Sequence, residues 1–445
     1  VCFKTPLLCL LTQKTAQKFG YVLGIKKEIR MKLGFINFST EEQLKMHQVM
    51  QAIQEHQAID ELGLGRIRDA FSNKLFPGIS TLHNRAKYYA ILPSLFLEAE
   101  KGTYKSANEV RAKVLNLEIK LTRQLLRGTE PANNWGITGS SVIDAAEAEN
   151  NKYVKYDPVY IYYGALVSYG MILTNSNIYS LIYEKSKTIH KQPKKYISQD
   201  EEKEMGDANQ LSGNYQLFDG GGLSYTFNGY TPINIDLTSD EAKFIKDKII
   251  ASSIAKDSFL ATILRDNYTI GLAQKSYFDL GDQWKKYMTD EHFMIYTLSA
   301  RFSKFQYLLR LVYNYVFYTR TDRTEEAEKE FERYEQLKEE WKSDISEENL
   351  FQALDFVGYT LQDNGSIKFC KEACSLINNP TDENFIRLQE IIVNREKQTK
   401  GSSRSKLANP NKYKGIDRIE AYFFDYRWGT VYNIITEIKK GLSNG

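Results

Sequence analysis

Residues 60–89, DELGLGRIRDAFSNKLFPGISTLHNRAKYY, decide the fold that we predict for this chain. A glycine pair, Gly63 and Gly65, precedes an amphipathic run that ends at Leu75, and Phe-Pro-Gly at 76–78 then forces a turn. A second helix is predicted over 80–100, with Ser80 at its start. This order is typical of a helix–turn–helix, whose second helix lies in a nucleic-acid groove.

The predicted second helix carries polar, basic and aromatic side chains in one short run. They are Ser80, Thr81, His83, Asn84, Arg85, Lys87, Tyr88 and Tyr89. The two hydroxyl residues would lie at a helix start, where anions bind, and Arg85 and Lys87 would contact phosphates. Asn84, with His83, would reach base edges, and the tyrosines would stack on bases. The alternative is an ordinary amphipathic helix whose polar face meets water and whose tyrosines pack in the core.

Three acidic residues lie beside this run: Asp60, Glu61 and Asp69. Phosphate repels a carboxylate, so an acid next to a nucleic-acid surface suggests catalysis. In glycosyl transfer a carboxylate stabilises the developing sugar cation and activates water. Asp60 or Glu61 would assist departure of a base, with Asp69 as the third candidate. The alternative is structural, with Asp60 capping the first helix and Glu61 completing its first turn.

Charge is distributed unevenly along the chain. Its 445 residues have a formal net charge of only +3, with 42% apolar and 26% charged residues, as in a globular protein. Residues 395–418 nevertheless hold eight Lys or Arg and two acids, whereas residues 320–355 hold thirteen acids and six bases. This asymmetry suggests one face for an anionic partner and an acidic arm, 322–348, for a protein partner. The alternative is that both runs are solvated faces.

The basic run begins with REKQTKGSSRSKL at 395–407, which combines glycine and serine with five bases. This composition suits a loop that grips DNA phosphates through Arg395, Arg404 and Lys406. A mobile surface loop is the alternative. In the closing YFFDYRW segment, flanking aromatic residues predict that Asp425 and Arg427 form a buried pair.

Several kinds of site have no support in the sequence. It contains no Walker loop and no GxGxxG, HExxH or GxSxG motif, and its five His and four Cys lack metal-ligand spacing. We therefore predict no metal and no cofactor. No run approaches the roughly 18 apolar residues of a membrane span, and the thiols suit a reducing compartment, so we expect a cytoplasmic protein without membrane contact.

The predicted fold is mainly α with small β hairpins. Residues 31–184 form the DNA-binding region of tandem winged-helix-like units, the second opening at Asp157-Pro158, and 237–445 form a helical domain with the basic loop 395–418. Residues 1–30 are an N-terminal extension, and the Gly- and Lys-rich residues 185–236 are a linker or loop. Other elements are predicted as a strand at 33–38, helices at 41–56, 64–75, 106–127, 346–360, 366–377 and 382–396, and a helical hairpin at 290–340.

Several motifs resemble an uncharacterised prokaryotic domain family that is often encoded in phage-defence islands. They are GFINFS, DELGLGRIRDAF, LFPGISTLHNRAKYY, LTSDEAKFIKDKI and the closing FDYRW…EIKKGL. The most specific is LFPG-x-S-x(4)-R at 75–85. The group also resembles the Brig-type anti-phage DNA glycosylases. That resemblance implies tandem winged helices, flipping of a glucosylated hydroxymethylcytosine out of phage DNA, and hydrolysis of its N-glycosidic bond to leave an abasic site.

Three hypotheses follow. The first is an anti-phage protein that binds double-stranded DNA and acts as a DNA glycosylase. The second is a non-enzymatic DNA-binding adaptor of a helicase or nuclease defence system. The third is a helical scaffold that binds protein through the acidic arm.

Overall fold

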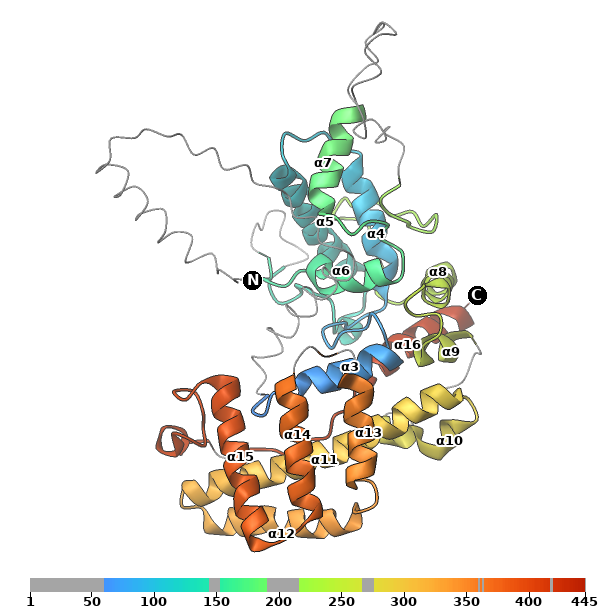
Figure 1. Ribbon diagram of the computed structural model, residues 1–445. Coiled ribbons are helices and arrows are strands. Elements are labelled where there is room, and N and C mark those ends of the chain that lie inside the picture. Colours follow the sequence, from blue (N-terminus) through green and yellow to red (C-terminus); the bar gives the residue numbers. More distant parts are fainter. Residues whose placement is uncertain are drawn as a thin grey trace, which may run out of the picture. The chain divides into compact units, whose positions relative to one another are not determined.

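The computed structural model describes residues 60–143, 153–189, 216–265, 276–358, 361, 364–416 and 419–444, which are mainly helical (Figure 1). The predicted α class is therefore confirmed. The β hairpins are not confirmed, because the strand-like pairing in these ranges is an isolated antiparallel bridge between Ile172 and Phe218. The extension 1–30, the strand predicted at 33–38 and the helix predicted at 41–56 lie outside the described residues.

A first group of helices surrounds α4 (Lys87–Glu100). α5 (Ala107–Gly128), α6 (Pro158–Ser168) and α7 (Ile178–Ile189) all pack against it. Because α4 is buried nearly all round, its sequence shows no wide polar stripe. α5 and α6 begin at caps, where the side chains of Ser106 and Asp157 accept hydrogen bonds from backbone amides three residues later, and the start at Asp157-Pro158 was predicted. The short η1 (Pro131–Asn133) follows α5.

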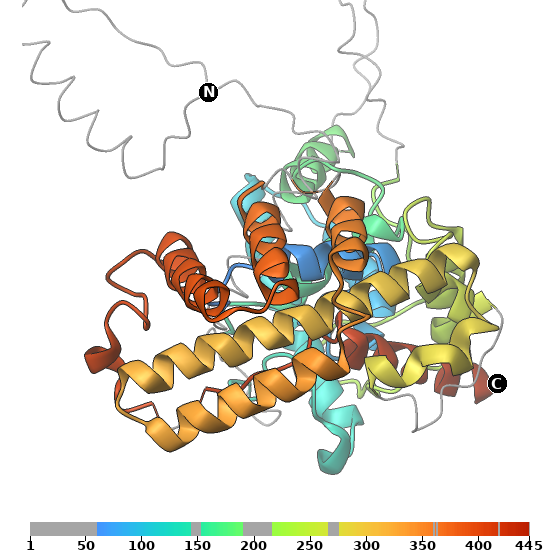
Figure 2. The same cartoon turned by 60° about the horizontal axis from the view of Figure 1, so that its bottom comes forward.

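A second group is built on α11 (Asp290–Arg320), whose 31 residues extend for about 46 Å. α12 (Thr324–Glu340) returns beside it as the predicted hairpin (Figure 2). α13 (Glu347–Gly358), α14 (Asn364–Asn378) and α15 (Asp382–Lys400) follow, each packed against the next, and α13 and α15 also contact α11. α3 (Gly65–Leu75) packs on α11 and α13.

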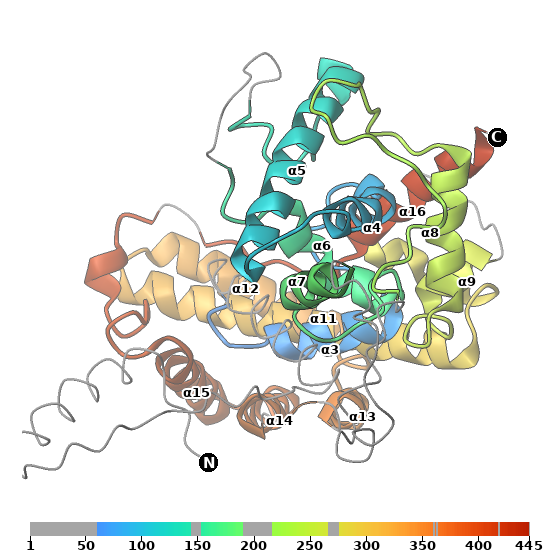
Figure 3. The same ribbon diagram turned by 90° about the horizontal axis from the view of Figure 1, so that it is seen from above.

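A third group contains α8 (Ser239–Ala251), α9 (Phe259–Arg265) and α16 (Trp428–Ser443). α8 lies along α16 and also packs on α4 (Figure 3). It begins at a capping box, in which Thr238 and Glu241 each accept the other's backbone amide. The short elements η3 (Tyr277–Leu280), α10 (Gly281–Lys285) and η4 (Pro410–Tyr413) complete the described helices.

The second helix of the predicted helix–turn–helix begins later than expected. α4 starts at Lys87, so the prediction of a helix start at Ser80 is wrong. The Ser80 amide instead donates to Nδ1 of His83, 3.2 Å away, and the His83 amide donates to the Ser80 carbonyl. The imidazole accepts the Ser80 amide, the Leu82 amide donates to the Ser80 hydroxyl at 3.3 Å, and the helix begins only at Lys87.

The helices of the predicted pair also pack against different partners. α3 lies on α11 and α13, whereas α4 lies among α5, α6, α7 and α8. These contacts do not confirm a winged-helix unit. They also connect residues before and after the predicted linker 185–236, of which the described part includes the buried Phe218 and Ile235. Among the described residues, none of the helices combines the length and the apolar composition needed to cross a bilayer.

The contact between α5 and the loop 226–236 provides a test of this packing. A Cβ atom at Gly128 would lie 2.4 Å from the carbonyl carbon and oxygen of Ile233, so the loop backbone lies directly against the last turn of α5. Alanine is normally the better helix residue. We nevertheless expect Gly128→Ala to lower the free energy of unfolding by about 1–3 kcal/mol, because the added methyl overpacks the contact.

The matched control is Gly358→Ala at the end of α13, where a Cβ would meet nothing within 4 Å. It should change the free energy of unfolding by less than about 1 kcal/mol. Urea titrations followed by circular dichroism would measure both variants. Equal stability of the two would contradict the close approach of the loop to α5.

Candidate functional site

Asp60 is a helix cap. Its Oδ1 accepts the Leu64 amide at 3.0 Å and its Oδ2 accepts the Gly65 amide at 2.6 Å. Gly63, with φ of +65°, allows the chain to turn back over this carboxylate. The geometry thus agrees with the structural role that was the alternative to catalysis for Asp60, because a backbone amide at the start of α3 donates to each of its carboxylate oxygens.

Glu61 lies in a buried ionic cluster and is only 3% exposed. Its carboxylate is 3.0 Å from Nζ of Lys406, 3.4 Å from Nζ of Lys400 and 3.5 Å from a guanidinium nitrogen of Arg310. Glu396 is the second acid of the cluster, 3.6 Å from Lys400. Three cations against two carboxylates give a net charge of +1. The structure therefore joins a predicted catalytic acid, Glu61, to a predicted DNA-binding residue, Lys406.

Glu396 organises the predicted phosphate-gripping loop from inside. This fully buried carboxylate accepts the Lys406 and Leu407 amides at 3.0 and 2.9 Å, and the Ser405 hydroxyl at 2.7 Å. Tyr313 of α11 donates a further hydrogen bond at 2.8 Å. The amides on the inner side of this loop are thus bonded to the chain's own carboxylate.

The three bases predicted in this loop have different surroundings. Lys406 is buried against Glu61. Arg395 donates to the Leu62 carbonyl at 2.9 Å and to the Ser366 hydroxyl at 2.6 Å, so it holds the loop 60–65 in place. Arg404 is exposed, and its Nε donates to the Lys400 carbonyl at 2.9 Å. Among the three, Arg404 alone is exposed.

The outer part of this loop packs against the turn between α11 and α12 (Figure 2). Arg320 donates to the Leu407 carbonyl at 2.6 Å, and Lys414 lies 3.0 Å from Asp322. Four exposed bases therefore gather here, and we call them the basic corner: Arg320, Arg404, Lys412 and Lys414. Asp322 is the acid that the described contacts place among them.

Arg85 and Lys87 are buried, contrary to the exposed basic face expected of them. Arg85 lies 2.5 Å from Glu437 and 3.1 Å from Asp236, and Lys87 lies 2.7 Å from Glu241. Burial lowers the pKa of Lys87, an effect that Glu241 opposes. Burial likewise raises the pKa of Glu437, which Arg85 opposes. These pairs connect the start of α4 to α8 and α16.

The rest of the 80–89 run is mostly core. The Tyr89 hydroxyl donates a 2.8 Å hydrogen bond to Nδ1 of His83, the nitrogen that also accepts the Ser80 amide, and the Tyr88 hydroxyl accepts the Thr138 amide at 2.9 Å. Both tyrosines and Ser80 are buried, whereas Thr81 and Asn84 are exposed. The prediction that the polar and aromatic side chains of this run are exposed is therefore wrong for most of them. After the turn at 76–78 the run lies against α6 instead of facing solvent.

Asp69 belongs to a structural contact. It lies 2.9 Å from the Arg427 guanidinium, which also donates to the Asn73 side chain at 2.9 Å and the Ile79 carbonyl at 2.8 Å. Arg427, with φ of +66°, precedes α16. The predicted partner of its guanidinium, Asp425, instead accepts the Arg427 backbone amide at 3.0 Å. Asp69 thus links α3 to the start of α16.

Sequence reasoning missed two exposed aromatic residues, Trp135 and Tyr230, each of which lies beside an arginine. The sequence gives little indication of either residue, because Trp135 follows η1 in an irregular segment and Tyr230 lies in the glycine-rich stretch that is predicted to be a linker or loop. Arg310 of the ionic cluster was also missed, since nothing local marks it among the apolar residues of α11.

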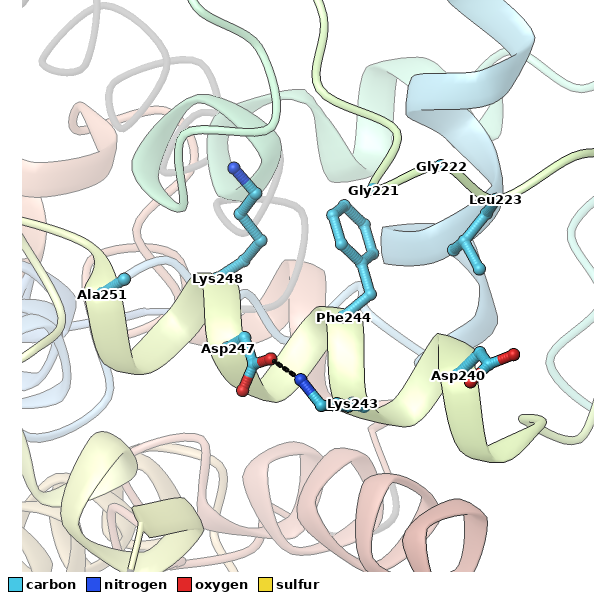
Figure 4. Close-up of a pocket in the computed structure, with 9 residues that line it drawn as sticks. All are labelled: Gly221, Gly222, Leu223, Asp240, Lys243, Phe244, Asp247, Lys248 and Ala251. Atoms are coloured by element: carbon cyan, nitrogen blue, oxygen red, sulfur yellow. Dashed lines mark hydrogen bonds and ion pairs between the residues drawn. The ribbon is translucent and has the colours of Figure 1, made fainter. Parts of the chain in front are cut away.

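A hollow of about 500 Å³ lies between α8 and residues 221–223 (Figure 4). The lining holds two lysines and two aspartates and so carries no net formal charge: Lys243 pairs with Asp247 at 2.5 Å, Lys248 pairs with Asp219 outside the lining, and Asp240 is the remaining charged residue. Phe244 lies against Gly221 on its floor. Nothing in this lining selects a ligand. Within the described ranges, no group of His, Cys, Asp and Glu side chains has a geometry that would hold a metal ion.

Comparison with known proteins gives one match. Residues 31–184 match the model of a family of unknown function (DUF6361). No curated protein and no solved structure matches the chain. The matched region includes the loop 60–65 and helices α3 to α6, but not the basic corner. Over residues 31–184 the chain is therefore similar to an uncharacterised domain family.

Proposed function

We propose that this protein binds double-stranded DNA through the basic corner and acts in anti-phage defence, as its sequence resemblance implies. The observation that carries the proposal is the presence of four exposed bases, Arg320, Arg404, Lys412 and Lys414, on the loop after α15 and the adjoining end of α11, where Lys414 pairs with Asp322. Bases that neutralise phosphates release condensed counterions, which drives binding without sequence preference.

The loop that carries Arg404, Lys412 and Lys414 is held by hydrogen bonds within the chain. Glu396 holds its inner side, and outside it the Asn409 side chain donates to the Ser402 and Ser405 carbonyls at 2.6 and 2.9 Å. Tyr413 donates to the Arg404 carbonyl at 3.2 Å. A preformed loop loses little conformational entropy when it binds phosphate, which favours this surface over a mobile one.

The activity that we propose is excision of a glucosylated hydroxymethylcytosine from phage DNA. Glu61 is the best-placed of the three acids, because its partner Lys406 belongs to the same loop as Arg404. A carboxylate at the flipped nucleotide would stabilise the sugar cation as the base departs. Since Glu61 is buried, excision requires the cluster to open. A winged-helix unit stays part of this proposal, because its predicted first helix and strand lie outside the described residues.

A non-enzymatic adaptor is the second candidate, and a specific observation favours it. Asp60, Glu61 and Asp69 all have internal partners, so none is exposed as a ready catalytic group. An adaptor needs a second surface for a helicase or nuclease. The acidic arm 322–348 is suited to that role, since α12 exposes several glutamates.

The first test is the salt dependence of duplex binding. We expect Arg404→Ala and Lys412→Ala each to reduce the slope of log K against log salt by about 1, equally for all sequences, because each removes one phosphate contact. Fluorescence anisotropy with a labelled duplex at several salt concentrations would measure the slopes. The control is Lys342→Ala, whose side chain is 76% exposed on the acidic arm. Unchanged slopes in both variants would refute binding at the basic corner.

The second test is for excision itself. Incubation of the full chain with glucosylated phage DNA, followed by alkali, should produce strand breaks at abasic sites. Glu61→Gln should slow their formation by about 100-fold or more, as loss of a catalytic carboxylate does. Glu437→Gln controls for loss of another buried, arginine-paired carboxylate. A folded wild-type protein that binds the duplex but gives no breaks would leave the adaptor as the function.

A further inference from the structure

Exposed aromatic rings are few in the described part of the chain. They are Trp135, Tyr230, Tyr422 and Phe423. Phe423 stacks on Tyr307 with ring centroids 4.2 Å apart, and Tyr422 lies against the Arg310 guanidinium at 3.8 Å. Trp135 and Tyr230 are the most exposed of the four, at 53% and 64%. Neither residue belongs to the hydrophobic core of the described residues.

Trp135 follows the C-terminal end of α5 by way of η1, and Tyr230 lies on the loop 226–236, which contacts the same end of α5. In the loop 226–236, the Ile233 amide donates to the Gln124 carbonyl at 3.0 Å and the Ile235 amide to the Thr129 hydroxyl at 3.1 Å. Arg85 joins the two loops, because it donates to the Trp135 carbonyl and to Asp236, each at 3.1 Å.

The turn that presents Tyr230 is held by side chains. Oδ1 of Asn228 accepts the Tyr230 and Thr231 amides at 2.8 and 2.9 Å. Nε2 of Gln124 donates to the Thr226 and Thr231 carbonyls at 2.7 and 2.8 Å. An exposed ring on a fixed turn is ready for stacking without further ordering.

Each ring has a guanidinium on one side. The Arg85 guanidinium carbon lies 4.9 Å from the Trp135 ring centre, and that of Arg127 lies 5.6 Å from the Tyr230 ring centre. Such a cation stabilises an electron-rich ring and reinforces stacking of a nucleobase on it. The large exposure of both rings leaves area for a base.

A stripe of bases runs along α5 toward Tyr230. Lys113, Lys120 and Arg127 are spaced by seven residues, so they lie on one face of the helix, about 10 Å apart. The described residues include no ion-pair partner for Lys113 or Lys120. Acids on this face lie at its ends, where Glu109 accepts the Lys105 amide at 2.8 Å and Glu130 follows the helix.

We propose that Trp135, Tyr230 and this stripe form a stacking platform for the unpaired bases of a DNA strand. The rings would stack on successive or spaced bases, and the stripe would neutralise the phosphates between them. The platform is a second site, separate from the basic corner. It rests on the proposed function in one respect, which is the origin of the single strand that it would bind. A strand from which a base is flipped, or which a partner helicase has opened, supplies such bases.

Tryptophan fluorescence tests the platform directly. The other three tryptophans, Trp284, Trp341 and Trp428, are at most 9% exposed, so quenching by added oligonucleotide reports on Trp135. Titration of the full chain with oligo(dT) at low salt should quench this emission. Trp135→Leu should abolish the quenching. Tyr230→Ala should weaken binding by about 5- to 150-fold, the range for loss of one stacked base.

Matched variants separate stacking from other effects. Tyr230→Phe keeps the ring and should bind oligo(dT) within about 2-fold of wild type, since stacking needs no hydroxyl. Ile254→Ala removes another exposed apolar side chain, 47% exposed, and should change nothing. The double variant Arg404→Ala/Lys412→Ala should lose duplex affinity yet keep the quenching.

The outcomes distinguish this proposal from the proposed function. Quenching by oligo(dT) without duplex binding would retain the platform and refute the basic corner. Absence of quenching with a folded protein, or unchanged oligo(dT) affinity in Tyr230→Ala, would overturn the platform. The exposed rings would then be assigned to a protein contact instead.

Discussion

The arrangement of the molecule around α11 depends on the burial of two carboxylates, Glu61 and Glu396. Removing an ion from water costs several kcal/mol unless cations and hydrogen-bond donors surround it. Here Arg310, Lys400 and Lys406 supply the charge, and Tyr313 and the amides at 406–407 supply donors. Because the partners come from α11, α15, the loop 60–65 and the loop 401–407, these segments can pack in only one mutual arrangement. The position of the basic corner follows from that constraint.

The same rule explains why most of the predicted DNA-binding residues are buried. Arg85 and Lys87 lie in a run that is locally polar and basic, yet their partners Asp236, Glu241 and Glu437 are more than 140 residues away. Lys406 pairs with Glu61, which lies 345 residues before it in the sequence. A local pattern identifies a charge but not its partner, and the partner decides whether the charge faces solvent.

Elements that depend on local bonds were predictable from the sequence. The caps at Ser106, Asp157 and Thr238 each use a side chain that reaches an amide three residues ahead, so the starts of α5, α6 and α8 could be identified. Ser80 has the same residue type, but His83 bonds its amide and the helix begins seven residues later. Of the candidate site, the capping by Asp60 and the exposure of Arg404 were predictable. The ionic cluster was not, because it combines residues from three stretches that are distant in the sequence: the loop 60–65, α11, and α15 with the loop that follows it.

Internal ion pairing also decides which basic residues remain available to bind a ligand. Bases that satisfy a buried carboxylate stabilise the fold, and extracting them for a phosphate would leave that carboxylate unpaired at a cost of about 3–5 kcal/mol. Bases that pair with no buried carboxylate can bind a phosphate without this cost. This criterion removes Arg85, Lys87 and Lys406 and retains Arg404 and Lys412 at one place and Lys113 and Lys120 at another. The stripe that contains the second set ends at Arg127, beside the exposed ring of Tyr230, whereas Lys412 of the first set lies beside the half-buried ring of Tyr413, so the chemistry of the two surfaces differs. A duplex, which offers phosphates, suits the first, and an open strand, which offers phosphates and bare base faces, suits the second.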